Sequence, residues 1–574
     1  MTIGIFGVRI EDGLSVVHGI PLAEEPGVGA LTLPGYVQEI ARRYGPREAA
    51  VLHLDGERLS WTYDDLLARS TEVAKALIAV GVGKGNRVGF IITNRLEFLS
   101  NLFGAALAGA IATPISTFYT ASEMEEVLNV AGLSVLIIER KVLRKDFAEL
   151  LIGLEPQIGT AKPGEVASLK FPFLRHLAMI DQENDLGAIE GWSAFLARGA
   201  GISDAMVEAT AASAMPADPG ILLFSSGSTG KAKGILNSHR GPCLQFWRWP
   251  RWYNFAPDAP PRTWGANGFF WSGNLCQQVA GTLSSGGTLV LQRWFDPEEA
   301  LALMEAEKVT MPIAWPHQWP QLEAAPNFGS VDLSAMRYAD YRTPFARHPT
   351  IHSTWRQNDE SYGNTEAFTL ITVFAVGTPA EAAEGTHGIP TAGSTVKIVD
   401  PFSGKTMPLG ERGEIAVKGP TLTLGYLGIP LDETLDEEGF LRTADGGFID
   451  EQGRLHWEGR LNDIIKTGGA NVSPLEIDEV IRDMPGVKVS QTVGVPDELL
   501  GELVVGCIVP KPGADLSEES IRAYAREKLA SYKIPRRVLF FAEDELKVTG
   551  SSKIKTADLR KLAADRLAAE KAQG

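Results

Sequence analysis

Short apolar runs alternate with amphipathic helical patterns along most of this chain. Helical patterns begin, for example, at the capping pair Thr62 and Asp65, with a stop at Gly81, and again over Pro297–Glu307. The apolar runs have the length of buried strands, and they occur at Val88–Ile92, Val135–Ile138, Ile221–Phe224, Thr288–Leu291, Val396–Val399 and Glu414–Val417. This alternation predicts an α/β fold.

Near residues 459–463 the helix and strand patterns are interrupted, and those that follow are smaller. Just before this point, Phe448–Trp457 has the pattern of a β-hairpin with its turn at Gln452 and Gly453. Beyond it, smaller helix and strand patterns resume, including a helix from Leu516 to Leu529 and an amphipathic tail after Thr556. We therefore predict two domains, residues 1–461 and 462–574, the second being large enough for a small core of its own.

Composition narrows the class of protein. The 574 residues include 54 Lys and Arg against 71 Asp and Glu, a net charge of −17 without a long basic block, which argues against nucleic acid as a partner. The three cysteines lack metal-ligand or disulfide spacing, and the N-terminus has acidic residues where a signal peptide has bases. The longest apolar stretch, Leu102 to Ile115, is too short for a membrane span and is interpreted as a buried helix. These features predict a cytoplasmic protein without a transmembrane segment.

A glycine-rich segment, FSSGSTGKAKG, follows the apolar run that ends at Phe224. Glycine lets backbone N–H groups converge on an anion, hydroxyls add donors and lysine adds positive charge, so the composition suits a polyphosphate. The spacing excludes a Walker P-loop, because only two residues separate Gly227 from Gly230 and Ala232 stands where Ser or Thr would hold magnesium. Taken alone, the segment is also compatible with an ordinary solvated turn between two strands.

The segment resembles the phosphate-binding motif of the adenylate-forming superfamily, which includes acyl-CoA synthetases, luciferases and peptide-synthetase adenylation domains. Ala232 replaces the proline of that motif. The matching residues are Ser225, Ser226, Gly227, Ser228, Thr229, Gly230, Lys233 and Gly234. Five further matches follow in the family's order: YGNTE at 362–366, TAD at 443–445, Gly459-Arg460, IKTGGANVSPLEIDEVI at 465–481 and TGSSKIKT at 549–556. The resemblance implies a large N-terminal domain of packed α/β subdomains and a small mobile C-terminal α+β domain.

The resemblance also implies a site for ATP and Mg²⁺. The loop from Ser225 to Gly230, with Lys233, is similar to the family's cradle for the β and γ phosphates, where charge builds up as pyrophosphate leaves. Glu366 is similar to the magnesium-binding carboxylate, and Asp445 to the acid that accepts hydrogen bonds from the ribose hydroxyls. The remaining residues of the implied ATP site are Tyr362, Gly363, Asn364, Thr365 and Arg460.

In the C-terminal part, the resemblance implies a catalytic lysine, a hinge and a loop for the pantetheine arm of CoA. Lys553 is similar to the catalytic lysine that neutralises both the attacking carboxylate and the α-phosphate, although Ser552 stands where the family prefers glycine. Asn462 occupies the hinge, where Asp or Lys is more usual, and Gly468 and Gly469 are similar to the loop past which the pantetheine arm of CoA moves.

The acyl pocket is predicted from an aromatic segment. Phe270 and Trp271 match the position where family members place an aromatic residue or histidine beside the acyl group, and such a wall favours an apolar acid. Tryptophans 247, 249, 252 and 264 are as compatible with core packing. Residues 337–344 depart from the family's glycine-rich segment, so Arg337 or Arg342 either meets a polar group of the acid or turns outward, and Asp340 is a candidate anchor for an amino group.

The sequence thus predicts an AMP-forming carboxylate–CoA ligase that uses ATP, Mg²⁺ and CoA on a medium- or long-chain, aryl or alicyclic acid. An acyl-AMP ligase that loads the phosphopantetheine of a carrier protein is the rival enzyme. A nucleotide-binding regulator on a degraded scaffold is the non-enzymatic alternative, motivated by Ala232, Ala444 and Ser552. The assembly, monomer or homodimer, is left open.

Overall fold

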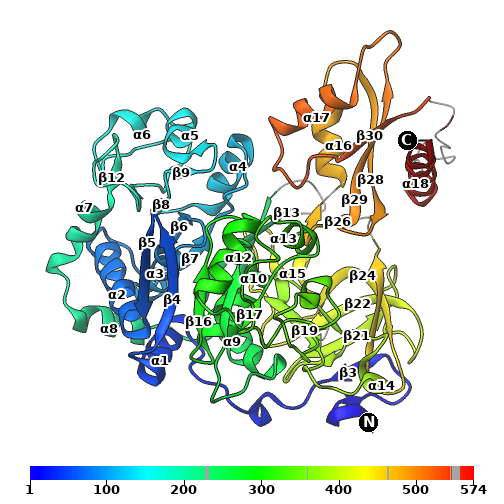
Figure 1. Ribbon diagram of the computed structural model, residues 1–574, viewed down its shortest axis with the longest axis horizontal. Helices are drawn as coiled ribbons and strands as arrows, with labels where there is room; N and C mark the ends of the chain where they lie inside the picture. Colours follow the sequence, from blue (N-terminus) through cyan, green and yellow to red (C-terminus); the bar gives the residue numbers. More distant parts are fainter. Residues whose placement is uncertain are drawn as a thin grey trace.

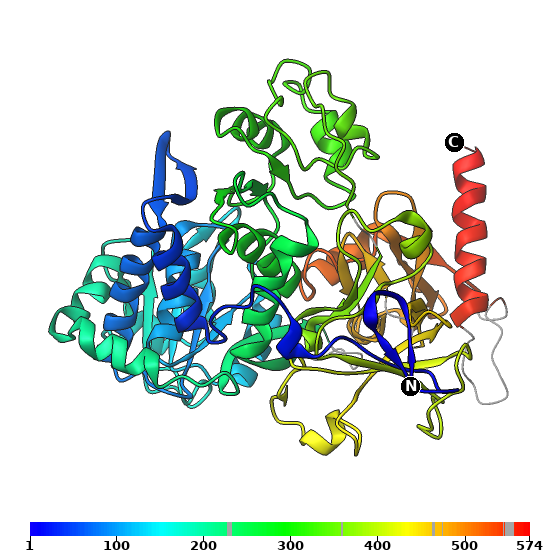
Figure 2. The ribbon, with the colours of Figure 1, turned by 90° about the horizontal axis from the view of Figure 1, so that it is seen from below.

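The computed structural model describes residues 1–226, 232–357, 360–461, 465–472, 474–542, 545 and 556–573. It shows a large body of packed sheets and helices, with a smaller unit at one end that contains the residues after 465 (Figure 1). The N-terminal residues run beneath the body and join the sheet that lies nearest the small unit (Figures 1 and 2). This is the mixed α/β architecture that the alternating pattern predicts.

Three of the predicted apolar runs, Val88–Ile92, Val135–Ile138 and Ile221–Phe224, lie in the first large sheet. Its strands are, in spatial order, β12 (Ile189–Gly191), β11 (His176–Met179), β8 (Val135–Ile138), β6 (Arg87–Ile91), β7 (Ile111–Pro114), β13 (Pro219–Ser226), β14 (Ala232–Ser238) and β23 (Gly425–Tyr426). The pairs from β12 to β13 are parallel, whereas β14 and β23 add antiparallel pairs at one edge. Because carboxyl ends of parallel strands meet at one edge of a sheet, loops after β7 and β13 lie on the same side.

Helices cover both faces of this sheet. On one face, α1 (Leu33–Tyr44), α2 (Tyr63–Ala79), α3 (Leu96–Leu107) and α9 (Arg240–Trp252) share a core with Val88, Phe90 and Leu223. On the other, α4 (Ala121–Ala131) and α5 (Phe147–Leu154) pack on Ile91, Leu136 and Leu222. Neighbouring strand residues point to opposite faces, which is why uninterrupted apolar runs such as Val135–Ile138 are buried on both sides.

Two further sheets complete the large domain. One contains β17 (Met311–Pro312), β15 (Arg262–Gly265), β16 (Thr288–Leu291), β4 (Glu48–Leu54) and β5 (Glu57–Thr62), with α12 (Pro297–Ala306) packed against it. The other is antiparallel and contains β1 (Thr2–Ile3), β2 (Arg9–Ile10), β3 (Val16–His18), β21 (Thr395–Val399), β22 (Gly413–Lys418), β24 (Leu441–Ile449) and β25 (Leu455–Arg460). A short sheet of β18 (Ser361–Asn364), β19 (Thr369–Val373) and β20 (Ile389–Pro390) lies in the same body.

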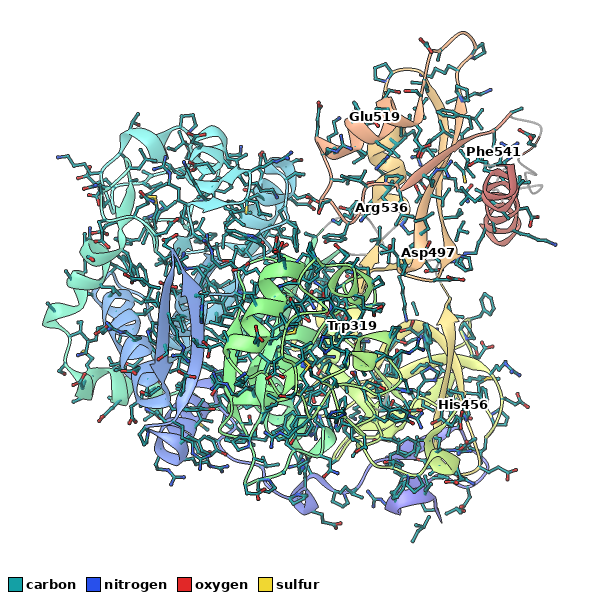
Figure 3. All side chains as sticks on the ribbon, in the orientation of Figure 1. Trp319, His456, Asp497, Glu519, Arg536 and Phe541 are labelled. Carbon is teal, nitrogen blue, oxygen red and sulfur yellow. The ribbon has the colours of Figure 1, made fainter. Side chains whose placement is uncertain are left out.

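The small domain has its own sheet and core. The strands are β27 (Ala470–Val472), β26 (Ile465–Thr467), β29 (Gly501–Pro510) and β28 (Val487–Asp497), with β30 (Arg537–Phe540) pairing in parallel with β29. α16 (Pro474–Arg482) and α17 (Glu518–Arg526) pack on one face, and α18 (Thr556–Gln573) on the other. α18 lies on the outer side of the small domain in both views (Figures 1 and 2), whereas Asp497 and Arg536 lie at the end nearest Trp319 of the large domain (Figure 3).

Several local predictions can be compared with these elements. Thr62 and Asp65 form the predicted capping box of α2, and residues 448–457 form the predicted hairpin between β24 and β25. The predicted buried helix over 102–115 is wrong in its second half: α3 ends at Leu107, and the chain turns at Gly109 (φ +76°) before Ile111 enters β7. The helix predicted from Leu516 to Leu529 is shorter in the structure, which begins α17 at Glu518.

Candidate active site

A cavity of about 480 Å³ lies where the small domain meets the large one. The large domain contributes walls from the carboxyl end of β13, the start of β14, the segment around Trp271 and the end of β18, and the small domain contributes its glycine loop. The lining residues that the sequence predicted for the site are Ser225, Lys233, Phe270, Trp271, Asn364, Thr365, Glu366 and Gly469. Residues that the motifs assigned to phosphate, metal, acid and thiol are therefore brought together in one space.

The structure describes the two strands that flank the predicted phosphate loop. β13 and β14 pair antiparallel, with Ser225 opposite Lys233 and Ser226 opposite Ala232, so the strands hold the two ends of the loop side by side. The Lys233 ammonium lies 5.1 Å from the ring centre of Tyr426, at the cavity wall. The backbone N–H of Ala232 donates to Glu126 of α4 at 3.1 Å. Gly227, Ser228, Thr229 and Gly230 lie outside the described residues, so their phosphate role stays a prediction.

Glu366 presents a carboxylate at the cavity. It lies in a single 3₁₀ turn, Thr365–Ala367, that Asn364 caps by accepting a hydrogen bond from the Ala367 N–H at 2.9 Å. Tyr426 donates its hydroxyl proton to Glu366 Oε1 at 2.8 Å, which orients the carboxylate. In the described part of the chain, no cluster of three or more His, Cys, Asp or Glu side chains suits a metal. One carboxylate is nevertheless compatible with Mg²⁺, because this ion is commonly held by one or two protein carboxylates together with substrate phosphates and water.

Tyr362 and Asp445 meet directly. The Tyr362 hydroxyl donates to one Asp445 oxygen at 2.7 Å, and the Trp457 indole N–H donates to the other at 3.2 Å. Asp445 is only 3% exposed and is not among the residues that line the cavity, and its backbone pairs with that of Arg460 across β24 and β25. Each carboxylate oxygen has a second lone pair that can accept a hydrogen bond from a ribose hydroxyl. These contacts are therefore compatible with the ribose role of Asp445, which stays a prediction.

Two backbone positions explain why small residues occur in these motifs. A Cβ on Gly363 would lie 1.7 Å from the Thr369 carbonyl oxygen, so no other residue fits between the strands. Ala444, which stands where the family motif has glycine, lines the cavity in the left-handed conformation with φ +57°. Alanine pays about 1–2 kcal/mol for that conformation, which glycine adopts freely. The substitution that suggested a degraded scaffold thus retains the backbone shape that glycine would favour.

The small-domain loop enters the cavity through its glycines. Gly468 and Gly469 have φ values of +56° and +81°, and a Cβ on Gly469 would lie 3.1 Å from the Trp315 ring. Gly468 lies correspondingly close to His317, since its Cβ would be 3.4 Å from the imidazole. The predicted hinge Asn462 and the predicted catalytic Lys553 lie outside the described residues.

Aromatic side chains from both domains form one wall. The ring centre of Trp271 lies 4.7 Å from that of Phe270, 5.7 Å from that of Phe118 and 5.0 Å from that of Trp315, and all four residues belong to the large domain. Tyr532 of the small domain lies 6.2 Å away, edge on. Burial raises the pKa of the Tyr532 phenol, so its hydroxyl stays protonated at neutral pH. Trp271 therefore borders both the cavity and the junction between the domains, and its contact with the acyl group stays a prediction.

The departure at residues 337–344 lies outside the lining of this cavity. Asp340 accepts hydrogen bonds from the Arg342 side chain and from the Gln357 N–H, and these bonds hold the pKa of its carboxyl below the ordinary value despite burial. Arg337 and Arg342 are exposed, and no residue of this segment is among those that line the cavity. These contacts favour the outward-turned alternative over an anchor for the acid.

Several cavity residues were not predicted from the sequence. Tyr426 orients Glu366, Trp315 meets the glycine loop, and Tyr532 reaches Trp271 from the small domain. Trp457, outside the cavity lining, holds Asp445. None of them belongs to the motifs that pointed to the site. Tyr426 comes close through the pairing of β14 with β23, a contact between segments almost 190 residues apart that no local pattern indicates.

Comparison with known proteins supplies independent findings. Residues 37–427 match the family described as AMP-binding enzyme, and residues 476–553 match the AMP-binding enzyme C-terminal domain. The chain is 31% identical over 544 residues to the (7a-methyl-1,5-dioxo-octahydro-inden-4-yl)propanoyl:CoA ligase of Mycobacterium tuberculosis, covering 92% of this chain and 99% of the relative. It is 30% identical over 530 residues to a feruloyl-CoA synthase of Amycolatopsis sp, covering 90% and 96%.

Solved structures show the same fold. The amide bond synthetase McbA from Marinactinospora thermotolerans superposes with a TM-score of 0.69 at 24% identity, covering 91% of this chain and 99% of that one. The o-succinylbenzoate CoA synthetase MenE from Bacillus subtilis superposes with a TM-score of 0.66 at 21% identity, covering 92% and 98%.

Proposed function

We propose that this chain, which belongs to the family of AMP-binding enzymes, acts on an apolar carboxylic acid of aryl, alicyclic or medium-chain type. Its activity is that of an AMP-forming acid–thiol ligase of the acyl-CoA synthetase type. The observation that carries the proposal is the shared cavity. Lys233 and Glu366, predicted for ATP and Mg²⁺, line the same space as Trp271 and Gly469, predicted for the acid and the thiol.

The reaction has two steps that this cavity is suited to support. An oxygen of the carboxylate attacks the α-phosphorus of ATP, the bond between that phosphorus and the α,β-bridging oxygen breaks, and pyrophosphate leaves as acyl-AMP forms. The sulfur of CoA then attacks the acyl carbon, the thiol proton is lost, and AMP leaves as the thioester forms. We propose that Lys233 and the ends of the loop, which line the cavity, supply positive charge and donors to the phosphates, and that Glu366 would hold Mg²⁺, which would neutralise phosphate charge when bound.

The proposed acid class rests on the character of the walls. Phe270, Trp271, Trp315 and Tyr532 present aromatic surface to the cavity, which favours an apolar acyl group by exclusion of water. The relatives' names agree with this class: one acts on a methyl-dioxo-octahydroindenyl propanoate, one forms feruloyl-CoA, and one from Danio rerio is a medium-chain acyl-CoA ligase.

A cytoplasmic location is a finer part of the proposal. All three cysteines are free and buried, as expected for packing residues in a reducing compartment. Within the described residues, the structure contains no helix with the length and apolar character of a membrane span.

A panel of acids, assayed with and without CoA, tests the proposal. We expect pyrophosphate release with aryl, alicyclic and medium-chain acids, and thioester formation only when CoA is present. Adenylate formation without any CoA thioester would favour the carrier-protein ligase. Neither pyrophosphate nor AMP from any acid would favour the nucleotide-binding regulator and contradict the proposal.

Replacing Trp271 by glycine tests its predicted role in the acyl pocket. We expect the preference to shift toward bulkier or longer acids, by roughly 10- to 200-fold in the ratio of kcat/KM values, because shape discrimination in an apolar pocket is worth about 1–3 kcal/mol per methylene-sized difference. The measurement is kcat/KM across a graded set of aliphatic and aromatic acids, together with thermal unfolding.

Trp264 provides the matched control. It is fully buried in β15, so its replacement by alanine should cost about 3–5 kcal/mol of stability without changing the order of preferred acids. If Trp271→Gly behaves in the same way, with an unchanged ranking and a lower melting temperature, Trp271 is a packing residue rather than a wall of the acyl site.

A further inference from the structure

A buried ion cluster joins the two domains beside the cavity. Lys533 of the small domain donates to Glu476 at 2.6 Å within its own domain and to Glu123 of the large domain at 3.0 Å. All three side chains are buried, with 3% of Lys533 and 8% of each glutamate exposed. Ion pairs shielded in this way are held more strongly than surface pairs, provided that each charge keeps its partners.

Glu123 has a second task that fixes its position. It is the third residue of α4, where its Oε2 accepts hydrogen bonds from the backbone and side chain of Thr120 in a capping box. Its other oxygen, Oε1, accepts from the Ala530 N–H and from the Lys533 ammonium, both at 3.0 Å. One carboxylate therefore starts a helix of the large domain and binds the small domain at the same time.

The same end of α4 makes further contacts with both domains. The Thr120 hydroxyl also lies 3.3 Å from the Lys528 carbonyl oxygen of the small domain, which is a second acceptor for the proton that it shares with Glu123. One turn along the helix, Glu126 accepts from Ala232, the first residue of β14. The helix that receives the small domain is thus attached to the strand that follows the phosphate loop.

We infer that Glu123 is a positioning residue for thioester formation: by holding Lys533 and Ala530, it keeps the small domain in the orientation in which Gly469 lines the cavity. The inference rests on the proposed function. The resemblance implies a mobile small domain that brings Lys553 to the site for adenylation, whereas the contacts of Glu123 exist in the arrangement in which Gly469, implied for the thiol, lines the cavity. We therefore assign these contacts to the second step. Losing them should therefore slow thioester formation and leave adenylation nearly unchanged.

The variant Glu123→Gln tests this inference. Glutamine keeps the size of the side chain and can serve the capping box, but it leaves the buried Lys533 with a single carboxylate. We expect the rate of thioester formation from preformed acyl-AMP and CoA to fall about 30-fold or more, the scale seen when one partner of a buried charge pair is removed. The rate of pyrophosphate release in the absence of CoA should change by less than about two-fold.

Two comparisons separate positioning from general damage. Glu125→Gln changes a partly exposed glutamate on the same helix, which pairs with Lys170 at 2.8 Å, and should leave both steps intact. Lys533→Met should reproduce the selective loss, with an additional cost in stability because it also removes the pair with Glu476. In thioester formation the double variant Glu123→Gln/Lys533→Met should be little worse than Lys533→Met, because the pair between Glu123 and Lys533 is already absent.

The outcomes distinguish the inference from the proposed function. A wild-type protein that forms no CoA thioester from any acid contradicts the proposed function. A wild-type enzyme that is active, with Glu123→Gln either unaffected or impaired equally in both steps, overturns only the role of Glu123. Strictly additive losses in the double variant would also overturn it.

Discussion

Replacing Lys553 by alanine is expected to reduce the rate of acyl-adenylate formation by about 100- to 1,000-fold, the usual effect of removing one preorganised electrostatic group from an active site. The ammonium is predicted to lie between the acid and the α-phosphate, two anions that repel each other as the new bond forms. A compact charge on a flexible stem suits this bridging role. The measurement is pyrophosphate release with saturating acid and ATP, in the absence of CoA.

Binding and the second step serve as internal controls for this variant. ATP affinity should change little, because Lys233, Glu366 and the other predicted nucleotide contacts belong to the large domain. Thioester formation from preformed acyl-AMP should also persist, since Gly469, Ala470 and Tyr532, the described residues of the small domain that line the cavity, are unchanged in this variant. Lys511→Ala, an exposed lysine of the small domain, should be silent in all three assays. Normal adenylation by Lys553→Ala would show that the assignment is wrong.

The sequence predicted the architecture well because its signals are local. Uninterrupted apolar runs indicated strands buried on two faces, and Val135–Ile138 and Thr288–Leu291 match β8 and β16 residue for residue. The capping box at Thr62 and the hairpin before residue 457 are likewise read from neighbouring residues. The interpretation failed over residues 102–115, where one apolar stretch contains both a helix end and a strand, and hydrophobicity alone cannot divide them.

The site was predictable as a set of motifs, and less so as a set of contacts. Ser225, Lys233, Glu366 and Gly469 were named from their motifs, and the structure places all four at one cavity. What holds them there depends on strand register and domain docking. The bond from Tyr426 to Glu366 requires β23 to lie beside β14, and the pair formed by Glu123 and Lys533 joins residues 410 positions apart.

Ala444 illustrates how structure changes the interpretation of a departure. From the sequence, alanine in place of glycine suggested a weakened motif. In the structure the residue adopts φ +57° at the cavity wall, so the chain tolerates a strained backbone to keep this shape. Strain of this kind is retained where the surrounding structure enforces it, here in a strand whose next residue, Asp445, is held by Tyr362 and Trp457.

Replacing Gly469 by alanine is expected to produce the opposite effect to Lys553→Ala, with the second step lost and the first retained. At φ +81° an alanine costs about 1–2 kcal/mol, and its Cβ would stand 3.1 Å from the Trp315 ring, so the loop or the ring must shift by a few tenths of an ångström. Together these costs predict a decrease of about 10- to 30-fold or more in thioester formation from preformed acyl-AMP, since each 1.4 kcal/mol is a factor of ten.

The variant Gly513→Ala is a control that separates the effect of the contact with Trp315 from the free-energy cost of the left-handed backbone conformation. Gly513 lies in the same domain with φ +78°, but a Cβ there would have no atom within 4 Å. Both variants should lower the melting temperature to a similar extent, because the left-handed conformation is unfavourable for alanine at either position. Only Gly469→Ala should slow thioester formation, because only this residue approaches the large domain. Equal loss of activity in the two variants would attribute the effect to domain stability, and a normal thioester rate in Gly469→Ala would contradict the role of this loop in admitting the thiol.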